Sequence, residues 1–550
     1  MNHHCKSTLS KIHIVILILG LIACGGGNNT STFESKIKIS GKVSFDLISF
    51  NTAGTALDFN KKNISPAKGI VVEAINTSGI TIANGTTNEK GEYSLEVNQN
   101  TDVKIRVSAK MIMTGNANWN VQVSDNTNLI ANKHPLYISE SSLFFTSQDA
   151  TKDFYLPAGS NGLENGVSSS APFAILDAVY DAIQTVVAVE PNIIFPSLEI
   201  HWSPNNNTNQ GCWADGDIVT SFYLKIIDDN TSNCLSYLDV GQYKDKIYIL
   251  GRIDTDEYDR HVIIHEWGHY FEENFSRSDS IGGLHSPSKK LDLNLAFSEG
   301  WSNALAAIVT QDTIYKDSIG DNSYESFDIE SGGFNNNGWY SEASIQEIIY
   351  DIYDSDTENH DDISVGFEPI YSTLTSANFI NNDYQANIYS FAGILKNQLS
   401  QPERLKVDNL MNAEQIFGVG IEASGEINDG GIESTLPIYE TIYANSGPKV
   451  LCLYNEYGTL NTLGNVKYVI FEPQLAENYL ISLAIVDSNK QHGFDLSVIK
   501  SGNTVSSKKT YGNLDHRINL SANKYIFRIE AHPPTNFSGN YCFDLQVKTI

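Results

Sequence analysis

The stretch "DTDEYDRHVIIHEWGHYFEENF", residues 254–275, determines how the middle of this chain is interpreted. Its acidic start suits the first turn of a helix, where one of the polar residues 254–256 would be the cap. A helix through this stretch places His265 and His269 about 40° apart on one face, one turn from each other. Two such imidazoles either converge on a metal ion or are core histidines that happen to be neighbours.

The residue beside the first histidine favours the metal. Glu266 lies about 100° around the helix from His265, close enough to reach a metal-bound water without being a ligand itself. The spacing is His-Glu-x-x-His, in which two histidines bind Zn²⁺ and the glutamate is a general base. His261 is four residues before His265 but lacks an adjacent glutamate. We therefore interpret His261 as a packing or second-shell residue.

A third ligand is expected on the next helix. The run "LAFSEGWSNALAAIV", residues 295–309, has apolar residues at helical spacing and carries Glu299 among them. A buried glutamate is costly unless it is paired or binds a metal. Zinc held by two histidines and one carboxylate keeps a fourth position open for water. We predict that Glu299 completes the site, with a structural salt bridge as the alternative.

These two stretches together resemble the gluzincin metallopeptidases, especially thermolysin-like and fungalysin-like enzymes. The resemblance implies a zincin-like catalytic domain that hydrolyses peptide bonds, with His265, His269 and Glu299 as zinc ligands and Glu266 as general base. Metzincins are excluded, because this chain lacks their glycine and third histidine after His269.

The chain departs from the gluzincin pattern at three places. Asn303 stands where thermolysin-like enzymes have an aspartate that orients a ligand histidine, and its amide oxygen is the predicted substitute. The loop before Glu299 is longer and contains His285, which we expect to be a loop residue and not a ligand. At the junction where those enzymes have an oxyanion-stabilising histidine, this chain has Trp339 and Tyr340. We predict the Tyr340 hydroxyl in that role, with Tyr350, Tyr353 and His360 as alternatives and packing roles for all of them as a further one.

Two further segments of the central region carry predictions. A short strand at residues 247–250 is expected to be an edge strand that pairs with extended substrate backbone. The acidic run "DSDTENHDD", residues 354–362, is interpreted as a solvated loop, with Ca²⁺ binding as the alternative.

The first residues resemble a bacterial lipoprotein signal. The apolar run at residues 12–23 is too short for a stable membrane span, and it ends "LIAC" at Cys24. The resemblance implies cleavage before Cys24, acylation of that cysteine, and an exported protein at the cell surface or outer membrane. A plain secretory signal is the alternative. The glycine-rich residues 25–32 are interpreted as a flexible tether.

Both flanks of the central region alternate like β-strands. "TTNEKGEYSLEV", residues 86–97, resembles the carboxypeptidase regulatory-like β-sandwich. "ANKYIFRIE" (522–530) and "NYCFDLQV" (540–547) resemble the pre-peptidase C-terminal β-sandwich, with a generic immunoglobulin-like sandwich as the alternative. We therefore predict a multidomain chain with a β-sandwich at each end and a mainly α (α+β) catalytic domain between them. The predicted boundaries are 1–23 signal peptide, 24–36 tether, 37–155 β-sandwich and linker, 156–444 metallopeptidase domain, and 445–550 C-terminal β-sandwich.

The remaining cysteines suggest disulfides in an exported chain. By proximity and domain position alone, Cys212 would pair with Cys234 and Cys452 with Cys542. The net charge of −29 over 550 residues argues against a nucleic-acid partner, whose phosphates such a surface would repel.

The predicted function is therefore an exported, membrane-anchored zinc endopeptidase acting on a protein or peptide substrate. Two alternatives stay open at this point. The first is a non-catalytic surface lipoprotein that uses its β-sandwiches for adhesion or binding and holds a structural zinc. The second is a zinc hydrolase for non-peptide amides, because the motif does not specify the substrate.

Overall fold

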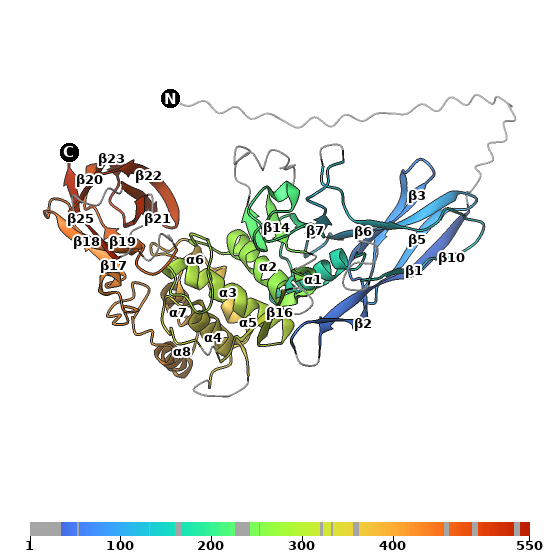
Figure 1. Cartoon of the computed structure of the whole chain (residues 1–550), viewed down its shortest axis with the longest axis horizontal. Coiled ribbons are helices and arrows are strands. Elements are labelled where there is room, and N and C mark those ends of the chain that lie inside the picture. The colour runs from blue at the N-terminus through green and yellow to red at the C-terminus, as the bar shows by residue number, and fades with distance from the viewer. Residues whose placement is uncertain are drawn as a thin grey trace, which may run out of the picture.

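The structure is a computed structural model, in which a long N-terminal β region, a helical centre and a C-terminal β-sandwich follow one another along the longest axis (Figure 1). It describes residues 35–51, 54–130, 133–159, 168–225, 243–251, 254–319, 323–331, 334–355, 362–455, 461–486, 493–532 and 539–550. The predicted signal segment, Cys24 and all but the last two residues of the predicted tether lie outside these residues. Cys234 and most of the acidic run predicted as a loop or calcium site lie outside them too.

The N-terminal region forms two sheets that share one apolar core. Alternation explains the strands: in β5, Tyr93, Leu95 and Val97 are buried while the residues between them are exposed. The five-stranded sheet has the order β10-β1-β11, with β2 and β5 also paired to β1. Its strands are β1 (Lys36–Phe50), β2 (Leu57–Pro66), β5 (Glu92–Asn98), β10 (Ala150–Thr151) and β11 (Phe154–Leu156).

The second sheet continues from the N-terminal region into the centre of the chain. Its order is β13-β14-β12-β7-β6-β3-β4, with β8 and β9 paired to β6. Strand β7 pairs in parallel with β12, so no sheet boundary coincides with the division predicted near residue 155. The strands are β3 (Ile70–Asn76), β4 (Thr81–Thr86), β6 (Asp102–Met113), β7 (Trp119–Ser124), β8 (Ile138–Glu140), β9 (Phe144–Phe145), β12 (Leu198–Trp202), β13 (Phe222–Lys225) and β14 (Asp245–Ile249).

Strand β14 contains the stretch predicted as a substrate-binding edge, and that prediction is wrong. β14 is flanked by β12 on one side and by β13 on the other. Residues 222–225, which the sequence analysis did not assign to a strand, fold antiparallel to β14 and cover its outer side. Within the described residues, β13 is therefore the last strand at this end of the sheet.

Helices α2, α3 and α4 lie together in the centre of the molecule (Figure 1). The close approach depends on small residues: a Cβ at Gly300 of α3 would lie 2.7 Å from Ile345 of α4, and one at Gly268 of α2 would lie 2.9 Å from Ser302 of α3. The helices are α2 (Arg260–Phe275), α3 (Leu293–Thr310), α4 (Glu342–Tyr353), α5 (Phe367–Leu374), α6 (Ala377–Ile380), α7 (Ile388–Leu395) and α8 (Gln401–Ala413), with a hairpin of β15 (Ile314–Ile319) and β16 (Ser323–Asp328).

Helix α1 (Ala171–Val189) is the one described helix that is long and apolar enough to cross a membrane by length and composition. Two-thirds of its apolar window is buried inside the molecule. It contacts α2 and strands β6 and β7, which accounts for its apolar surface as that of a core helix.

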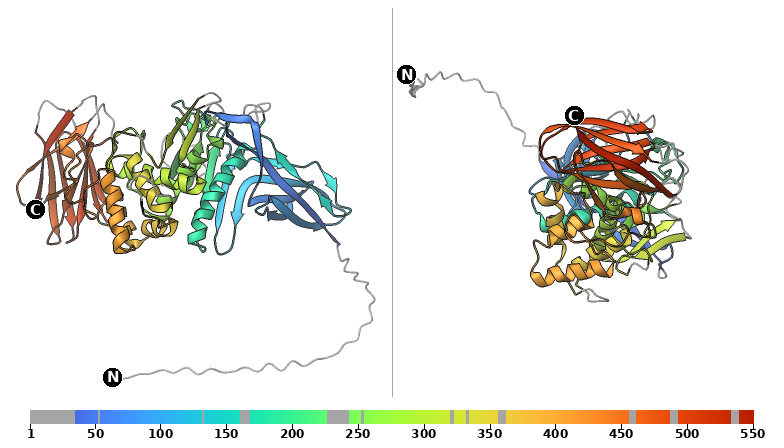
Figure 2. Two further views of the ribbon diagram at one scale, coloured as in Figure 1. Left: turned by 90° about the horizontal axis from the view of Figure 1, so that it is seen from below. Right: turned by 90° about the vertical axis from the view of Figure 1, so that its left-hand side faces the viewer.

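The C-terminal region is a β-sandwich with its own core, as predicted. Figure 2 shows it as a compact unit at the end of the molecule opposite the N-terminal sheets. One sheet has the order β17-β19-β24-β21-β22 and the other β18-β25-β20-β23. The strands are β17 (Tyr439–Ile442), β18 (Lys449–Asn455), β19 (Val466–Phe471), β20 (Glu477–Ile485), β21 (Gly493–Lys500), β22 (Asn503–Tyr511), β23 (Leu514–Leu520), β24 (Tyr525–His532) and β25 (Gly539–Thr549).

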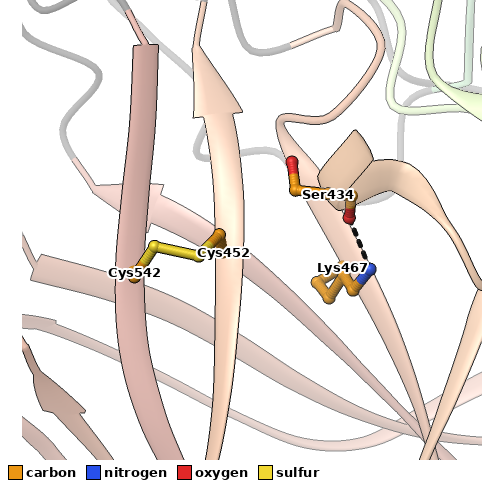
Figure 3. Close-up of a disulfide and its surroundings, with 4 residues drawn as sticks. All are labelled: Ser434, Cys452, Lys467 and Cys542. Atoms are coloured by element: carbon orange, nitrogen blue, oxygen red, sulfur yellow. Dashed lines mark hydrogen bonds between the residues drawn. A yellow bond between two sulfur atoms is a disulfide. The ribbon is translucent and has the colours of Figure 1, made fainter. Parts of the chain in front are cut away.

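The predicted disulfide between Cys452 and Cys542 is confirmed. The two cysteines are opposite each other on the antiparallel strands β18 and β25 (Figure 3). Nearby on β19, the ammonium group of the buried Lys467 donates a hydrogen bond to the carbonyl oxygen of Ser434. Cys212 also carries a disulfide, while its predicted partner lies outside the described residues.

The sandwich is attached to the start of α3. Asp292 caps α3 by accepting a hydrogen bond from the backbone of Asn294, 3.0 Å away. The Tyr468 hydroxyl on β19 donates to the same carboxylate at 3.0 Å and accepts from the Asn294 amide at 2.9 Å. The C-terminal sandwich thus supports the helix that carries Glu299.

Candidate metal centre

Helices α2 and α3 bring three predicted ligands together. His265 and His269 lie one turn apart on α2, and their Nε2 atoms are 3.1 Å from each other. Oε2 of Glu299, on α3, is 3.1 Å from Nε2 of His265 and 3.2 Å from Nε2 of His269. The three atoms form a nearly equilateral triangle.

This triangle fits a zinc ion. Ligand atoms about 2.1 Å from a tetrahedral zinc lie roughly 3.4 Å apart, close to the observed spacings. Glu299 is only 5% exposed, and its Oε2 accepts no hydrogen bond despite the nearby imidazoles. A buried carboxylate oxygen without a donor is costly unless a cation binds it. The donor set of two imidazoles and one carboxylate is one that zinc prefers.

Asn303 fixes the first histidine. Its Oδ1 lies 2.7 Å from Nδ1 of His265, and its amide donates to Gln346 on α4 at 2.9 Å. The hydrogen bond at Nδ1 leaves Nε2 free to face the ligand triangle. The contact is the one that the offset between Glu299 and Asn303 predicted.

His269 is held by polar groups of α2 and α3. Its Nδ1 lies 3.2 Å from the Ser302 hydroxyl and 4.0 Å from Glu272, which accepts a hydrogen bond from Ser298. Burial by itself would lower the pKa of His269, but the carboxylates of Glu299 and Glu272 raise it well above its usual value. The second histidine is therefore oriented, like the first, through Nδ1.

His285 lies in a loop, as predicted, but its side chain joins the cluster. Its Nε2 lies 3.3 Å from Oε2 of Glu299, and its Nδ1 lies 2.8 Å from the buried carboxylate of Glu342, the first residue of α4. The His285 ring is parallel to the ring of His265, with centroids 6.2 Å apart. Burial would lower the pKa of His285, but Glu299 and Glu342 raise it to about 9.

The cluster lies in a cleft of about 740 Å³. Glu266 lines this cleft beside the two histidines, as the motif requires. Phe222 and Tyr223 of β13 form part of one wall. Tyr315 and Phe327, from the β15–β16 hairpin, stack at 4.7 Å and form part of another wall.

The structure does not bring Tyr340 to this cleft. Its hydroxyl donates to the carbonyl of Asn337 and to Oδ1 of Asn428, and Tyr340 is not among the residues lining the cleft. The geometry contradicts the predicted oxyanion role, because the loop before α4 turns this side chain toward residues 428–430. His261 also points elsewhere, with its Nε2 2.9 Å from the carbonyl oxygen of Asp312.

The chain is similar to several solved structures at low sequence identity. The chain is similar to the pre-peptidase C-terminal domain of a collagenase from Bacillus anthracis, with 15% identity over 20% of this chain and 94% of that chain and a TM-score of 0.16. It is also similar to CorA, a surface-associated copper-binding protein of Methylomicrobium album BG8, with 11% identity over 20% of this chain and 98% of that chain and a TM-score of 0.16. No curated protein matches the chain. Among family models, the Mycolysin C-terminal domain matches residues 205–393, the segment that contains all four residues of the cluster.

Proposed function

We propose that this protein is a zinc-dependent endopeptidase with a zincin-like central domain. The observation that carries the proposal is the triangle of His265, His269 and Glu299 in the lining of a cleft that Glu266 also lines. These three residues would hold the metal. The match of residues 205–393 to a peptidase-associated family model supports the same class of activity.

Zinc bound at this triangle would make water more acidic and polarise the scissile carbonyl. Glu266 accepts the proton of the attacking water and delivers it to the nitrogen of the leaving amine. Asn303 and the polar neighbours of His269 keep the two imidazoles aligned throughout.

His285 takes the role that the sequence analysis gave to Tyr340. We infer that its Nε2, which lies 3.3 Å from Oε2 of Glu299, would also reach the carbonyl oxygen of a substrate bound at the metal, because Glu342 holds the opposite nitrogen and the ring lines the cleft. A donor placed where negative charge develops stabilises the transition state. Among the described strands, β13 is the outermost at this end of the sheet, and we propose that its outer edge pairs with extended substrate backbone in place of the β14 edge that was predicted.

We also propose an extracytoplasmic location. The Cys452–Cys542 disulfide supports it, because such bonds persist in oxidising compartments. The lipoprotein-like signal ending at Cys24 supports anchoring to a membrane through lipid, with a protein or peptide as the substrate and no nucleic-acid partner.

A second candidate function is a non-catalytic surface protein with a structural zinc. The proximity of His285 to Glu299 favours this candidate, because a fourth protein ligand would close the coordination sphere. Hydrolysis of a mixed peptide library separates the two. The endopeptidase produces new peptide ends that disappear with a chelator and return with added zinc. A structural site produces none, although the chelator lowers its melting temperature.

A further inference from the structure

A second cluster of charged residues lies in the same cleft and has no part in the proposed reaction. Asp254 and Asp256 come just before α2, and Asp317 lies on β15. One carboxylate oxygen of each residue lies within 4.8 Å of the other two. The prediction that one of the residues 254–256 caps α2 is wrong. Asp259 occupies the cap position, and residues 256–258 form a short 3₁₀ turn.

The central carboxylate of the cluster is buried with one oxygen unpartnered. Asp256 is 3% exposed, and its Oδ2 accepts a hydrogen bond from Ser221. Its Oδ1 is buried and has no hydrogen-bond partner, and the same is true of Oδ1 of Asp254. An unpaired buried carboxylate oxygen is destabilising unless a proton donor or a cation replaces its lost water.

No positive charge compensates the cluster within the described part of the chain. Asp254, Asp256 and Asp317 form no ion pair there with any lysine, arginine or histidine. Glu325 of β16 adds negative charge beside Asp254 and Asp317. Burial and these neighbouring carboxylates raise the pKa of Asp317 to about 7. When they are ionised, three carboxylates in this arrangement repel one another unless a cation lies between them.

We propose that Asp254, Asp256 and Asp317 bind a calcium ion at the entrance to α2. Oxygen ligands 2.3–2.6 Å from calcium lie no more than about 5 Å from one another, which the cluster satisfies. The donor set is carboxylate oxygen alone, which suits a hard cation, whereas zinc prefers the imidazole-rich cluster on α2 and α3. One side of the cluster opens to the cleft, so water completes the coordination.

The bound ion would join the start of α2 to the β15–β16 hairpin. The two are already linked by Ser318, whose backbone N–H and hydroxyl both donate to Asp259 at 2.6 Å. Asp317 is the residue before Ser318, and Tyr315 and Phe327 of the same hairpin line the cleft. Calcium would therefore stabilise this wall of the cleft, whether or not the protein is a peptidase.

The test measures binding without any enzyme activity. The full mature chain is stripped of metals, reloaded with one equivalent of zinc, and titrated with CaCl₂ while its melting temperature is recorded. Tb³⁺, which occupies oxygen-ligand sites, is titrated in parallel and displaced by Ca²⁺. We expect calcium to raise the melting temperature of the wild type by several degrees and to displace Tb³⁺, and Mg²⁺ to do neither at equal concentration.

Three isosteric variants locate the site. Asp256→Asn and Asp317→Asn should lose the calcium-dependent rise while melting at or above the wild-type temperature without calcium, because the repulsion is relieved. Asp254 lies nearer the surface, so Asp254→Asn should affect folding least. This variant should also lose the calcium-dependent rise in melting temperature. Glu347→Gln, at another acidic group on α4, should keep the full rise. The proposal is overturned if calcium does not change the melting temperature of the wild type. It is also overturned if the calcium-dependent rise in melting temperature persists in the three variants.

Discussion

Oδ1 of Asn303 lies 2.7 Å from Nδ1 of His265, and this contact joins the two helices that carry the proposed zinc ligands. The Asn303 amide is in turn fixed by Gln346. The orientation of the first ligand therefore depends on α3 and α4 as well as on its own helix.

Removing this contact should weaken zinc binding. We expect Asn303→Ala to lower zinc affinity by about 10–100-fold, because the His265 ring loses the partner that holds Nε2 toward the metal. Competition with a chromogenic chelator measures the affinity. Asn303→Asp is the matched control and should bind zinc at least as tightly as wild type. Equal affinities for the alanine variant and the wild type would show that Asn303 does not orient the ligand.

Loss of His285 should affect turnover more than metal content. His285→Ala is expected to retain one zinc per chain and to reduce kcat by about 10²–10³-fold, with a smaller change in KM, because a donor to the developing oxyanion is lost. Metal analysis and steady-state kinetics on one peptide give both values. Tyr340→Phe is the control and should retain normal kcat, since its hydroxyl bonds to Asn337 and Asn428. A zinc-free His285→Ala protein would instead identify His285 as a fourth ligand.

The contact between the C-terminal sandwich and α3 should contribute to stability. Tyr468→Phe removes a hydroxyl that donates to Asp292 and accepts from Asn294, at an expected cost of about 1–3 kcal/mol. Calorimetry should show a lower melting temperature for the unit containing α3. Tyr479→Phe, which loses a hydrogen bond to the carbonyl of Leu475 within the sandwich, should leave that transition unchanged. Identical scans for both variants would contradict a role for Tyr468 in docking.

Glu347 should make stability depend on pH. Burial, with Glu414 and Asp328 nearby, raises its pKa to about 8, so the folded protein keeps this proton after the unfolded chain has lost it. The free energy of unfolding should therefore fall as pH rises from about 4.5 to 8 and level off above. Glu347→Gln removes this fall in the free energy of unfolding, because glutamine does not titrate. The variant should be more stable than wild type at pH 8 by about 2–4 kcal/mol, with no difference at pH 4. Denaturant titrations at the two pH values check it, and an equal gain at both would count against this explanation.

The sequence predicted local features better than long-range ones. Hydrophobic periodicity indicated the two helices, and the resemblance to gluzincin metallopeptidases implied that Glu299 meets the α2 histidines and that Asn303 contacts a ligand histidine. The Cys452–Cys542 pairing depended only on the two ends of one β domain. His285 was placed outside the cluster because its position depends on Glu342, in a helix far along the chain. No local pattern identifies that partner.

The sheet topology could not be predicted from the sequence either, because it also depends on partners far apart along the chain. The parallel pairing of β7 with β12 crosses the boundary expected between two domains, and β13 is a four-residue strand with little alternation of its own. Asp254 and Asp256 looked like helix caps because capping and cation binding use the same residue type. Asp259 occupies the cap position of α2, and the approach of Asp317 from the β15–β16 hairpin is what supports cation binding by this cluster.

The most direct test of the central claim compares wild type with Glu266→Ala by N-terminal peptide profiling of a digested protein substrate, together with zinc analysis of both proteins. Glu266 lines the cleft but is not part of the ligand triangle. If Glu266 is the general base, each protein holds one zinc per chain, wild type produces zinc-dependent new N-termini, and the variant produces almost none. Cleavage by Glu266→Ala at the wild-type rate would contradict this role.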